Sequence, residues 1–168
     1  MRSTFWRRYR RSLLIFGALF GLVGLDQATK ELAKNLLRGN GLFTYLGDTM
    51  RLQYMENRGA FLSLGAALPE EYRFWFFSVG VVGLLIVVCG YLFTRKSHPL
   101  TTAALTLIVG GGAGNIIDRL NHGYVIDFMN VGIGELRTGV FNVADMAILA
   151  GVSYLFFEMF QKAPAKGK

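Results

Sequence analysis

Residues 100–117 read LTTAALTLIVGGGAGNII and contain no charged side chain. Residues 13–25, 74–93 and 140–160 form three further apolar stretches, in which Asp145 and Glu158 are the only charged residues. A helix needs roughly 20 apolar residues to cross the hydrocarbon core of a bilayer, so three of the four stretches are long enough on their own. This pattern predicts an integral membrane protein built mainly of helices.

The composition of the chain supports the same class. Of the 168 residues, 52% are hydrophobic and 17% are charged, whereas an ordinary soluble domain carries about 25% charged residues. The length indicates a single domain. The apolar content excludes a disordered chain, and the single cysteine excludes a disulfide scaffold. We expect no nucleic-acid partner, because membrane topology explains the net charge of +7.

The first apolar stretch follows several arginines, which is also the pattern of a secretory signal peptide. No small-x-small cleavage site follows residue 25, and the chain continues with helix-forming residues up to residue 37. We therefore expect an uncleaved span over residues 13–36 that carries Asp26 and Lys30 to the outer edge of the membrane. The other spans are expected at residues 73–94, 99–117 and 140–160.

The basic residues predict the orientation of these spans, because short cytoplasmic segments are rich in Lys and Arg. With four spans, both termini share one side with the turn at residues 95–98. That side holds ten basic residues: Arg2, Arg7, Arg8, Arg10, Arg11, Arg95, Lys96, Lys162, Lys166 and Lys168. We expect it to be cytoplasmic, so that residues 38–72 and 118–139 are extracytoplasmic.

The outer segments contain strand-like sequence. Residues 42–46 and 49–55 are rich in β-formers, and Gly47 and Asp48 between them predict a two-residue hairpin turn. Residues 124–131 also favour an extended chain. The predicted fold is an all-α membrane protein with four transmembrane helices and a small extracytoplasmic β-rich subdomain.

Two carboxylates stand out as candidates for chemistry. Asp145 is expected about five residues inside the last span, where an ionisable side chain is costly and by default a functional candidate. Asn142, one turn earlier, could hold it by a hydrogen bond. Asp127 lies in the apolar run Val-Ile-Asp-Phe with no adjacent cation. Two carboxylates in such surroundings can share a proton, so that one activates water while the other protonates a leaving amine.

The remaining outer aspartates have nearer partners in the sequence. Asp26 has Lys30 four residues later, which suits an ion pair on one helix face. Asp118 is followed directly by Arg119, which favours a local salt bridge or a helix terminus. Both aspartates are therefore weaker candidates for catalysis.

Other catalytic arrangements have little support. Cys89 lies in an apolar span, where a thiol is inert, and the two histidines are expected on opposite sides of the membrane. We expect no metal site and no cofactor. Residues 110–114, GGGAG, lie inside a span without a βαβ pattern, so they predict close helix packing rather than nucleotide binding.

Five ordered motifs resemble those of the bacterial lipoprotein signal peptidases, also called type II signal peptidases. They are DQATK at 26–30, NRGAF at 57–61, GGGAGNIIDR at 110–119, VIDF at 125–128 and FNVAD at 141–145. The resemblance implies an intramembrane aspartic endopeptidase that cuts signal peptides from diacylglyceryl-modified prolipoproteins. It also implies a location in the bacterial cytoplasmic membrane, with the active site on the extracytoplasmic side. We expect the protein to be a monomer in contact with membrane lipids.

The resemblance also assigns the site residues. It places the catalytic pair at Asp127 and Asp145. The surrounding polar site would comprise Asp26, Lys30, Asn57, Gly59, Asn115, Arg119 and Asn142. Arg119 and Lys30 would anchor Asp118 and Asp26. The sequence departs from the family pattern at Phe61-Leu62, where the family has a small residue followed by Phe.

A second hypothesis comes from another class of membrane protein. A small proton- or cation-coupled transporter could use Asp26, Lys30 and Asp145 as a relay. Transport predicts ionisable groups through the full depth of the membrane and internal repeats. Here the ionisable groups gather at the outer edge, which favours the peptidase.

Overall fold

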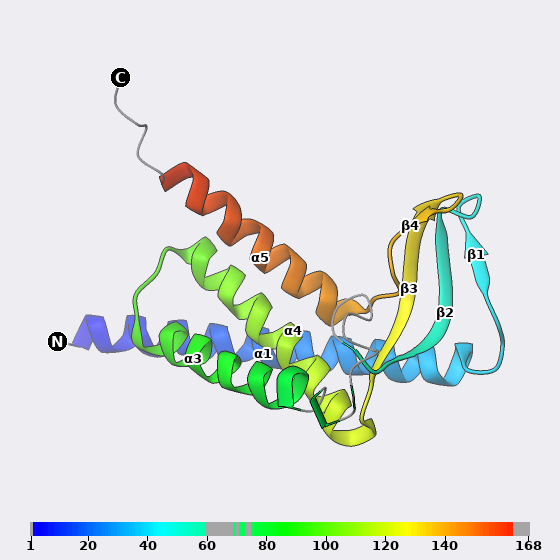
Figure 1. Ribbon diagram of the computed structural model, residues 1–168. Coiled ribbons are helices and arrows are strands. Elements are labelled where there is room, and N and C mark those ends of the chain that lie inside the picture. The colour runs from blue at the N-terminus through cyan, green and yellow to red at the C-terminus, as the bar shows by residue number, and fades with distance from the viewer. Residues whose placement is uncertain (1, 60–68, 70, 73–74, 163–168) are drawn as a thin grey trace.

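The computed structural model describes residues 2–59, 69, 71–72 and 75–162. The helices are α1 (Arg2–Leu37), α3 (Val81–Thr94), α4 (Pro99–His122) and α5 (Val143–Lys162), with a π-helical turn, η2 (Trp75–Gly80), leading into α3. The strands are β1 (Phe43–Tyr45), β2 (Met50–Asn57), β3 (Val125–Ile133) and β4 (Leu136–Arg137). Figure 1 shows the sheet at one end of the helices, with the start of α1 and the end of α5 at the other.

Three of the described helical segments are long and apolar enough to cross a membrane: Tyr9–Leu37, Pro99–His122 and Val143–Gln161. They contain the expected first and third spans and most of the fourth. The expected second span corresponds to a shorter apolar helix, Ser78–Thr94. The structure thus supports a mostly helical, multi-pass membrane protein with a small antiparallel sheet.

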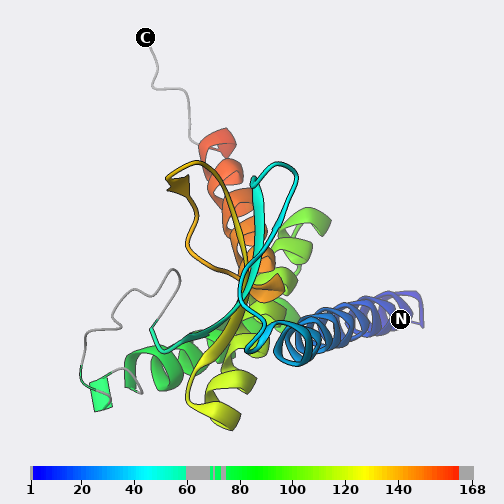
Figure 2. The same ribbon diagram turned by 90° about the vertical axis from the view of Figure 1, so that its right-hand side faces the viewer.

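Helix α4 lies at the centre of the bundle, and its glycines allow close packing. Figure 2 shows α1 and α3 on opposite sides of α4. A Cβ atom added at Gly111 would lie 2.5 Å from the carbonyl oxygen of Ala144 on α5, and one at Gly112 would lie 2.7 Å from the side chain of Leu85 on α3. A Cβ atom added at Gly151 of α5 would likewise lie 2.5 Å from the carbonyl oxygen of Ala104 on α4. The prediction that residues 110–114 permit close helix packing is confirmed.

The four strands form one antiparallel sheet in the order β1-β2-β3-β4. The predicted hairpin is present, but the prediction of a two-residue turn was wrong. Tyr45 pairs with Met50, so the loop has four residues, 46–49. Leu46, Gly47 and Asp48 all have positive φ angles there. The Asp48 carboxylate accepts hydrogen bonds from the Arg51 guanidinium at 2.5 and 2.7 Å, which stabilises this wider loop.

Strand β3 carries Asp127 and lies between β2 and β4. Asp127 is paired with Met55 of β2, just beyond an irregularity in the register. Phe128, the next residue, points to the other face and packs against Ala33 and Leu37 near the end of α1. The alternation of the strand therefore turns Asp127 away from this small core.

The last helix begins later than predicted. Residues 140–142 are not helical, and Phe141 forms an isolated β-bridge with Met129. Asn142 precedes the helix, and its side-chain oxygen accepts a hydrogen bond from the backbone N–H of Asp145 at 2.9 Å. Such a bond caps a helix N-terminus. The expectation that Asp145 lies five residues inside the span was therefore wrong: it lies in the first turn of α5.

Candidate active site

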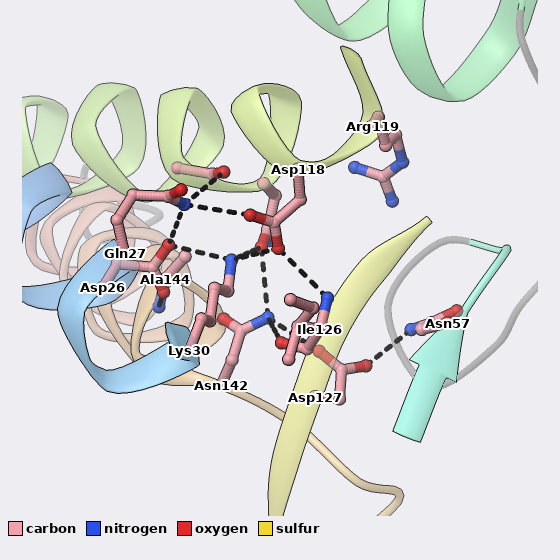
Figure 3. Close-up of polar contacts among 12 residues, drawn as sticks. Asp26, Gln27, Lys30, Asn57, Asp118, Arg119, Ile126, Asp127, Asn142 and Ala144 are labelled. Carbon is pink, nitrogen blue, oxygen red and sulfur yellow. Dashed lines mark hydrogen bonds and ion pairs between the residues drawn. The ribbon is translucent and has the colours of Figure 1, made fainter. Parts of the chain in front are cut away.

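The residues singled out from the sequence converge where the sheet meets the helices. Figure 3 shows side chains from α1, α4, β2, β3 and the start of α5 directed toward one another. The polar residues that are less than a tenth exposed include Asp26, Lys30, Asn57, Asn115, Asp118, Asp127, Asn142 and Asp145. Among the described residues, no buried side-chain nitrogen or oxygen lacks a hydrogen-bond partner.

Asn142 connects the two predicted catalytic carboxylates. Its side-chain nitrogen donates to Oδ1 of Asp127 at 2.7 Å. Its backbone N–H donates to Oδ2 of Asp145 at 3.3 Å, and its side-chain oxygen accepts from the backbone of Asp145. The exchange between Asn142 and Asp145 is a reciprocal cap of the helix start. One fully buried asparagine thus fixes the position of both aspartates.

The remaining carboxylate oxygens of the pair also accept hydrogen bonds. The side-chain nitrogen of Asn57, at the end of β2, donates to Oδ2 of Asp127 at 2.8 Å. The side-chain nitrogen of Asn115, on α4, donates to Oδ1 of Asp145 at 2.9 Å. Each carboxylate is therefore held at both oxygens, which fixes its orientation as well as its place.

The surroundings of Asp127 change its acidity. Burial and, after it, the neighbouring charge of Asp145 raise the pKa of Asp127 from 3.8 to about 7. The hydrogen bonds from Asn57 and Asn142 oppose this rise because they favour the ionised form. Near neutral pH the Asp127 carboxyl can therefore both hold and release a proton, as general acid–base chemistry requires.

Lys30 is a cation of the site and is almost fully buried. Its Nζ atom lies 2.8 Å from Asp26, 2.9 Å from Asp118 and 2.9 Å from the side-chain oxygen of Asn115, which accepts its hydrogen bond. An ammonium group has three N–H bonds, and these three contacts use all of them. Because Lys30 binds the side-chain oxygen of Asn115, it also orients the side-chain nitrogen of Asn115, which donates to Asp145.

The two carboxylates that bind Lys30 hold backbone groups next to the catalytic pair. Asp118 accepts a hydrogen bond from the backbone N–H of Ile126 at 3.0 Å, one residue before Asp127. Asp26 accepts one from the backbone N–H of Ala144 at 2.9 Å, one residue before Asp145. The ion cluster therefore acts on both aspartates through the main chain.

The prediction that Asp118 pairs with Arg119 was wrong. Asp118 pairs with Lys30, because the two consecutive residues leave α4 in different directions (Figure 3). Arg119 instead donates to the backbone oxygen of Gly59 at 2.9 Å. The backbone N–H of Gly59 donates to the side-chain oxygen of Asn57 at 2.9 Å, so Arg119 braces the turn that presents Asn57.

Gln27 is a site residue that the sequence reasoning missed. Its side-chain nitrogen contacts Asp26 at 3.3 Å and Asp118 at 2.9 Å, and it also donates to the backbone of α4. Its position beside Asp26 in the first motif was the available signal. Residues Phe61 and Leu62, where the sequence departs from the family pattern, lie outside the described residues.

A metal centre is not evident in the described part of the chain. No group of three or more His, Cys, Asp or Glu side chains is placed there to hold a metal ion. Asp26 and Asp118 are instead satisfied by the Lys30 ammonium group.

Comparison with known proteins gives consistent matches over nearly the whole chain. The family described as signal peptidase (SPase) II matches residues 18–161. The lipoprotein signal peptidase of Geobacter sulfurreducens is 37% identical over 153 residues, which cover 90% of this chain and 95% of that protein. The corresponding protein of Moorella thermoacetica is 33% identical over 147 residues, covering 88% and 93%. A solved bacterial membrane enzyme shares the fold, with a TM-score of 0.79 and 22% identity over 92% of each chain.

Proposed function

The chain belongs to the signal peptidase II family, and we propose from this membership and the site geometry that it cleaves lipoprotein signal peptides with Asp127 and Asp145 as its catalytic pair. Family membership makes it a peptidase, and its three long apolar helices make it a multi-pass membrane protein. The choice of the two aspartates, their protonation and the roles of their neighbours belong to the proposal.

The proposed chemistry requires one proton shared by the two carboxyls. The ionised carboxylate takes a proton from a water molecule, whose oxygen attacks the carbonyl carbon of the scissile peptide bond. The protonated carboxyl then gives its proton to the leaving amine as the carbon–nitrogen bond breaks. The pair gains one proton from water and gives one to the amine, so it returns to its starting state. The raised pKa of Asp127 supports such sharing.

The neighbouring residues hold the pair in place rather than react. Asn57, Asn115 and Asn142 orient the carboxylate oxygens. Asp26 and Lys30 fix the backbone beside the pair, together with Asp118. Gly59 and Arg119 support the turn after β2. These are positioning residues, and we expect their loss to reduce turnover more than substrate binding.

The membrane setting suits a lipidated substrate. We propose that the substrates are diacylglyceryl-modified prolipoproteins, whose signal helix and acyl chains approach through the bilayer. In this arrangement α3, with the residues before it, supplies a fourth span. The termini are cytoplasmic, and the sheet and site face the extracytoplasmic side of the bacterial cytoplasmic membrane. The gathering of basic residues at the end of the helices opposite the sheet supports this orientation. A single chain contains every residue proposed for the site, which supports action as a monomer.

The observation that carries the proposal is the link that Asn142 makes between the two aspartates. Two buried carboxylates joined by one amide, with all four oxygens bonded, form a costly arrangement that a purely structural role does not need. A transporter relay finds less support, because Asp26 and Lys30 are closed within their own ion cluster. Family membership also favours the peptidase over the transporter.

The test is cleavage of a diacylglyceryl-modified prolipoprotein by the purified protein in lipid nanodiscs. Asp127→Asn and Asp145→Asn should each abolish release of the signal peptide. Asp48→Asn is the matched control, because Asp48 lies at the hairpin loop and pairs with Arg51. That variant should cleave normally. If either Asp127→Asn or Asp145→Asn cleaved the substrate as fast as the original protein does, the assignment of the catalytic pair would be refuted.

A further inference from the structure

A groove lies between α1 and α4 at the end of the bundle away from the sheet. It encloses about 630 Å³. Its walls are mainly apolar: Leu14, Ala18 and Leu22 from α1, and Ala103, Thr106 and Leu107 from α4. It contains none of the residues placed in the catalytic site.

The length of the groove matches one leaflet of a membrane. Its lining on α1 runs from Arg10 to Leu22, which corresponds to about 18 Å at 1.5 Å per residue. Half of a hydrocarbon core of about 30 Å is about 15 Å. An acyl chain that lies along the groove would therefore have its polar end beside Arg10 and its methyl end near Leu22.

The mouth of the groove is positively charged. Arg10 and Arg11 line it. Arg11 donates to the backbone oxygens of Leu92 and Arg95 at 3.0 and 2.9 Å, which holds its guanidinium in place without neutralising it. Among the described residues, neither arginine forms an ion pair with Asp or Glu. The exposed Arg10 side chain therefore keeps its charge and its donors available.

We propose that this groove binds one anionic phospholipid, with an acyl chain between α1 and α4 and the phosphate at Arg10. Basic pockets between transmembrane helices on the cytoplasmic side are suited to acidic lipid headgroups. The bound lipid fills the space between two helices that separate at this end. Its single negative charge offsets one of the two positive charges at the mouth, and the catalytic site is left untouched.

The positive charge at the mouth of the groove argues against a signal peptide as its ligand. A signal peptide has an apolar helix of suitable size, but its N-terminal region is positively charged. That region would lie beside Arg10 and Arg11 and be repelled. A phospholipid with a negative headgroup matches both the walls and the mouth of the groove.

The test measures lipid binding to the purified protein by native mass spectrometry. Phosphatidylglycerol and phosphatidylcholine with identical acyl chains are compared. Arg10→Gln removes the proposed phosphate contact, and Ala103→Trp fills the groove without changing charge. The matched controls are Arg38→Gln, at the sheet end near Glu56, and Ala150→Trp, on an exposed position of α5. The cleavage of prolipoprotein is also measured for each variant, as a control that the variant retains its fold.

We expect phosphatidylglycerol to bind the unmodified protein at least fivefold more tightly than phosphatidylcholine. Arg10→Gln should weaken phosphatidylglycerol binding about fivefold, corresponding to about 1 kcal/mol for one lost charge. Ala103→Trp should weaken the binding of both lipids, and the two controls should bind as the unmodified protein does.

Four results would overturn the proposal. The first is equal binding of the two lipids, and the second is an equal effect of Arg10→Gln and Arg38→Gln. The third is complete displacement of the lipid by inorganic phosphate, which would indicate a free-anion site. The fourth is displacement by a synthetic signal peptide, which would assign the groove to substrate. None of these results depends on whether Asp127 and Asp145 are catalytic.

Discussion

Lys30→Met should be among the most destabilising single substitutions in the protein, because Lys30 is the cation that binds both Asp26 and Asp118 in a buried cluster. Nζ lies 2.8 Å from Asp26 and 2.9 Å from Asp118. At an effective dielectric constant of about 20, each contact contributes about 6 kcal/mol of attraction, most of which offsets the cost of burying the ions. Removing one partner of a buried pair typically costs about 3–5 kcal/mol. Here two carboxylates lose their partner, so we expect a loss of at least that size.

The measurement is the free energy of unfolding in mixed micelles, obtained by titration with a denaturing detergent. Lys34→Met is the matched control on the same helix. The Lys34 ammonium lies 3.7 Å from Glu31 on the surface, and such pairs contribute about 0–1 kcal/mol. If the two substitutions lower the free energy of unfolding by similar amounts, the ion cluster does not stabilise the fold as argued. Prolipoprotein cleavage should also fall in the Lys30 variant, because the backbone beside Asp127 and Asp145 loses its support.

Three further predictions concern packing, acidity and positioning. Gly111→Ala should lower both the melting temperature and the cleavage rate, because its Cβ would lie 2.5 Å from a carbonyl oxygen of α5. Gly17→Ala, with open space around it, should not lower either; equal melting temperatures would contradict the packing argument. Because the pKa of Asp127 is raised to about 7 in the folded protein, the folded state binds more protons than the unfolded state between about pH 4 and 7. Stability should therefore fall as pH rises through this range, and an unchanged slope in Asp127→Asn, measured by unfolding titrations, would show that another group is responsible. Asn142→Ala should reduce kcat more than tenfold with little change in KM, and a rise in KM alone would assign Asn142 to substrate binding instead.

Much of the candidate site could be predicted because polar residues are costly in an apolar setting. Asp145 stands out as one of two charged residues in the apolar stretches, and Asp127 as a carboxylate without a neighbouring cation. The motifs then pointed to Asn115 and Asn142, and the structure places both against the two carboxylates. The catalytic roles of these residues remain predictions that the cleavage assay tests.

The partners of Asp118 could not be predicted from neighbouring residues. Its ion pair is with Lys30, far away in the chain, because helix packing brings α1 and α4 together. Sequence reasoning favoured the adjacent Arg119, but consecutive residues on a helix point about 100° apart and seldom share a partner. Only the three-dimensional arrangement decides between a near residue and a distant one.

The ends of the elements were also less predictable than their existence. An apolar run predicts a span, but the start of α5 depends on Asn142 as its cap and on Phe141 pairing with Met129. The hairpin was correctly predicted, whereas its loop is longer than predicted and contains Asp48, which pairs with Arg51. Both differences involve specific hydrogen bonds, from side chains and from the backbone, that hydrophobicity does not report.

The glycine contacts of α4 also determine how the bundle responds to mechanical load. Gly111 and Gly151 bring main chain against main chain between α4 and α5, and a carbonyl oxygen cannot move without its whole helix. Gly112 instead meets the flexible end of Leu85 on α3, which can rotate about its own bonds. Of these two contacts, the one between α4 and α5 is therefore the stiffer and the one between α4 and α3 the more compliant. We therefore expect a bilayer that compresses or twists the helices to deform the contact with α3 before it changes the position of Asp145.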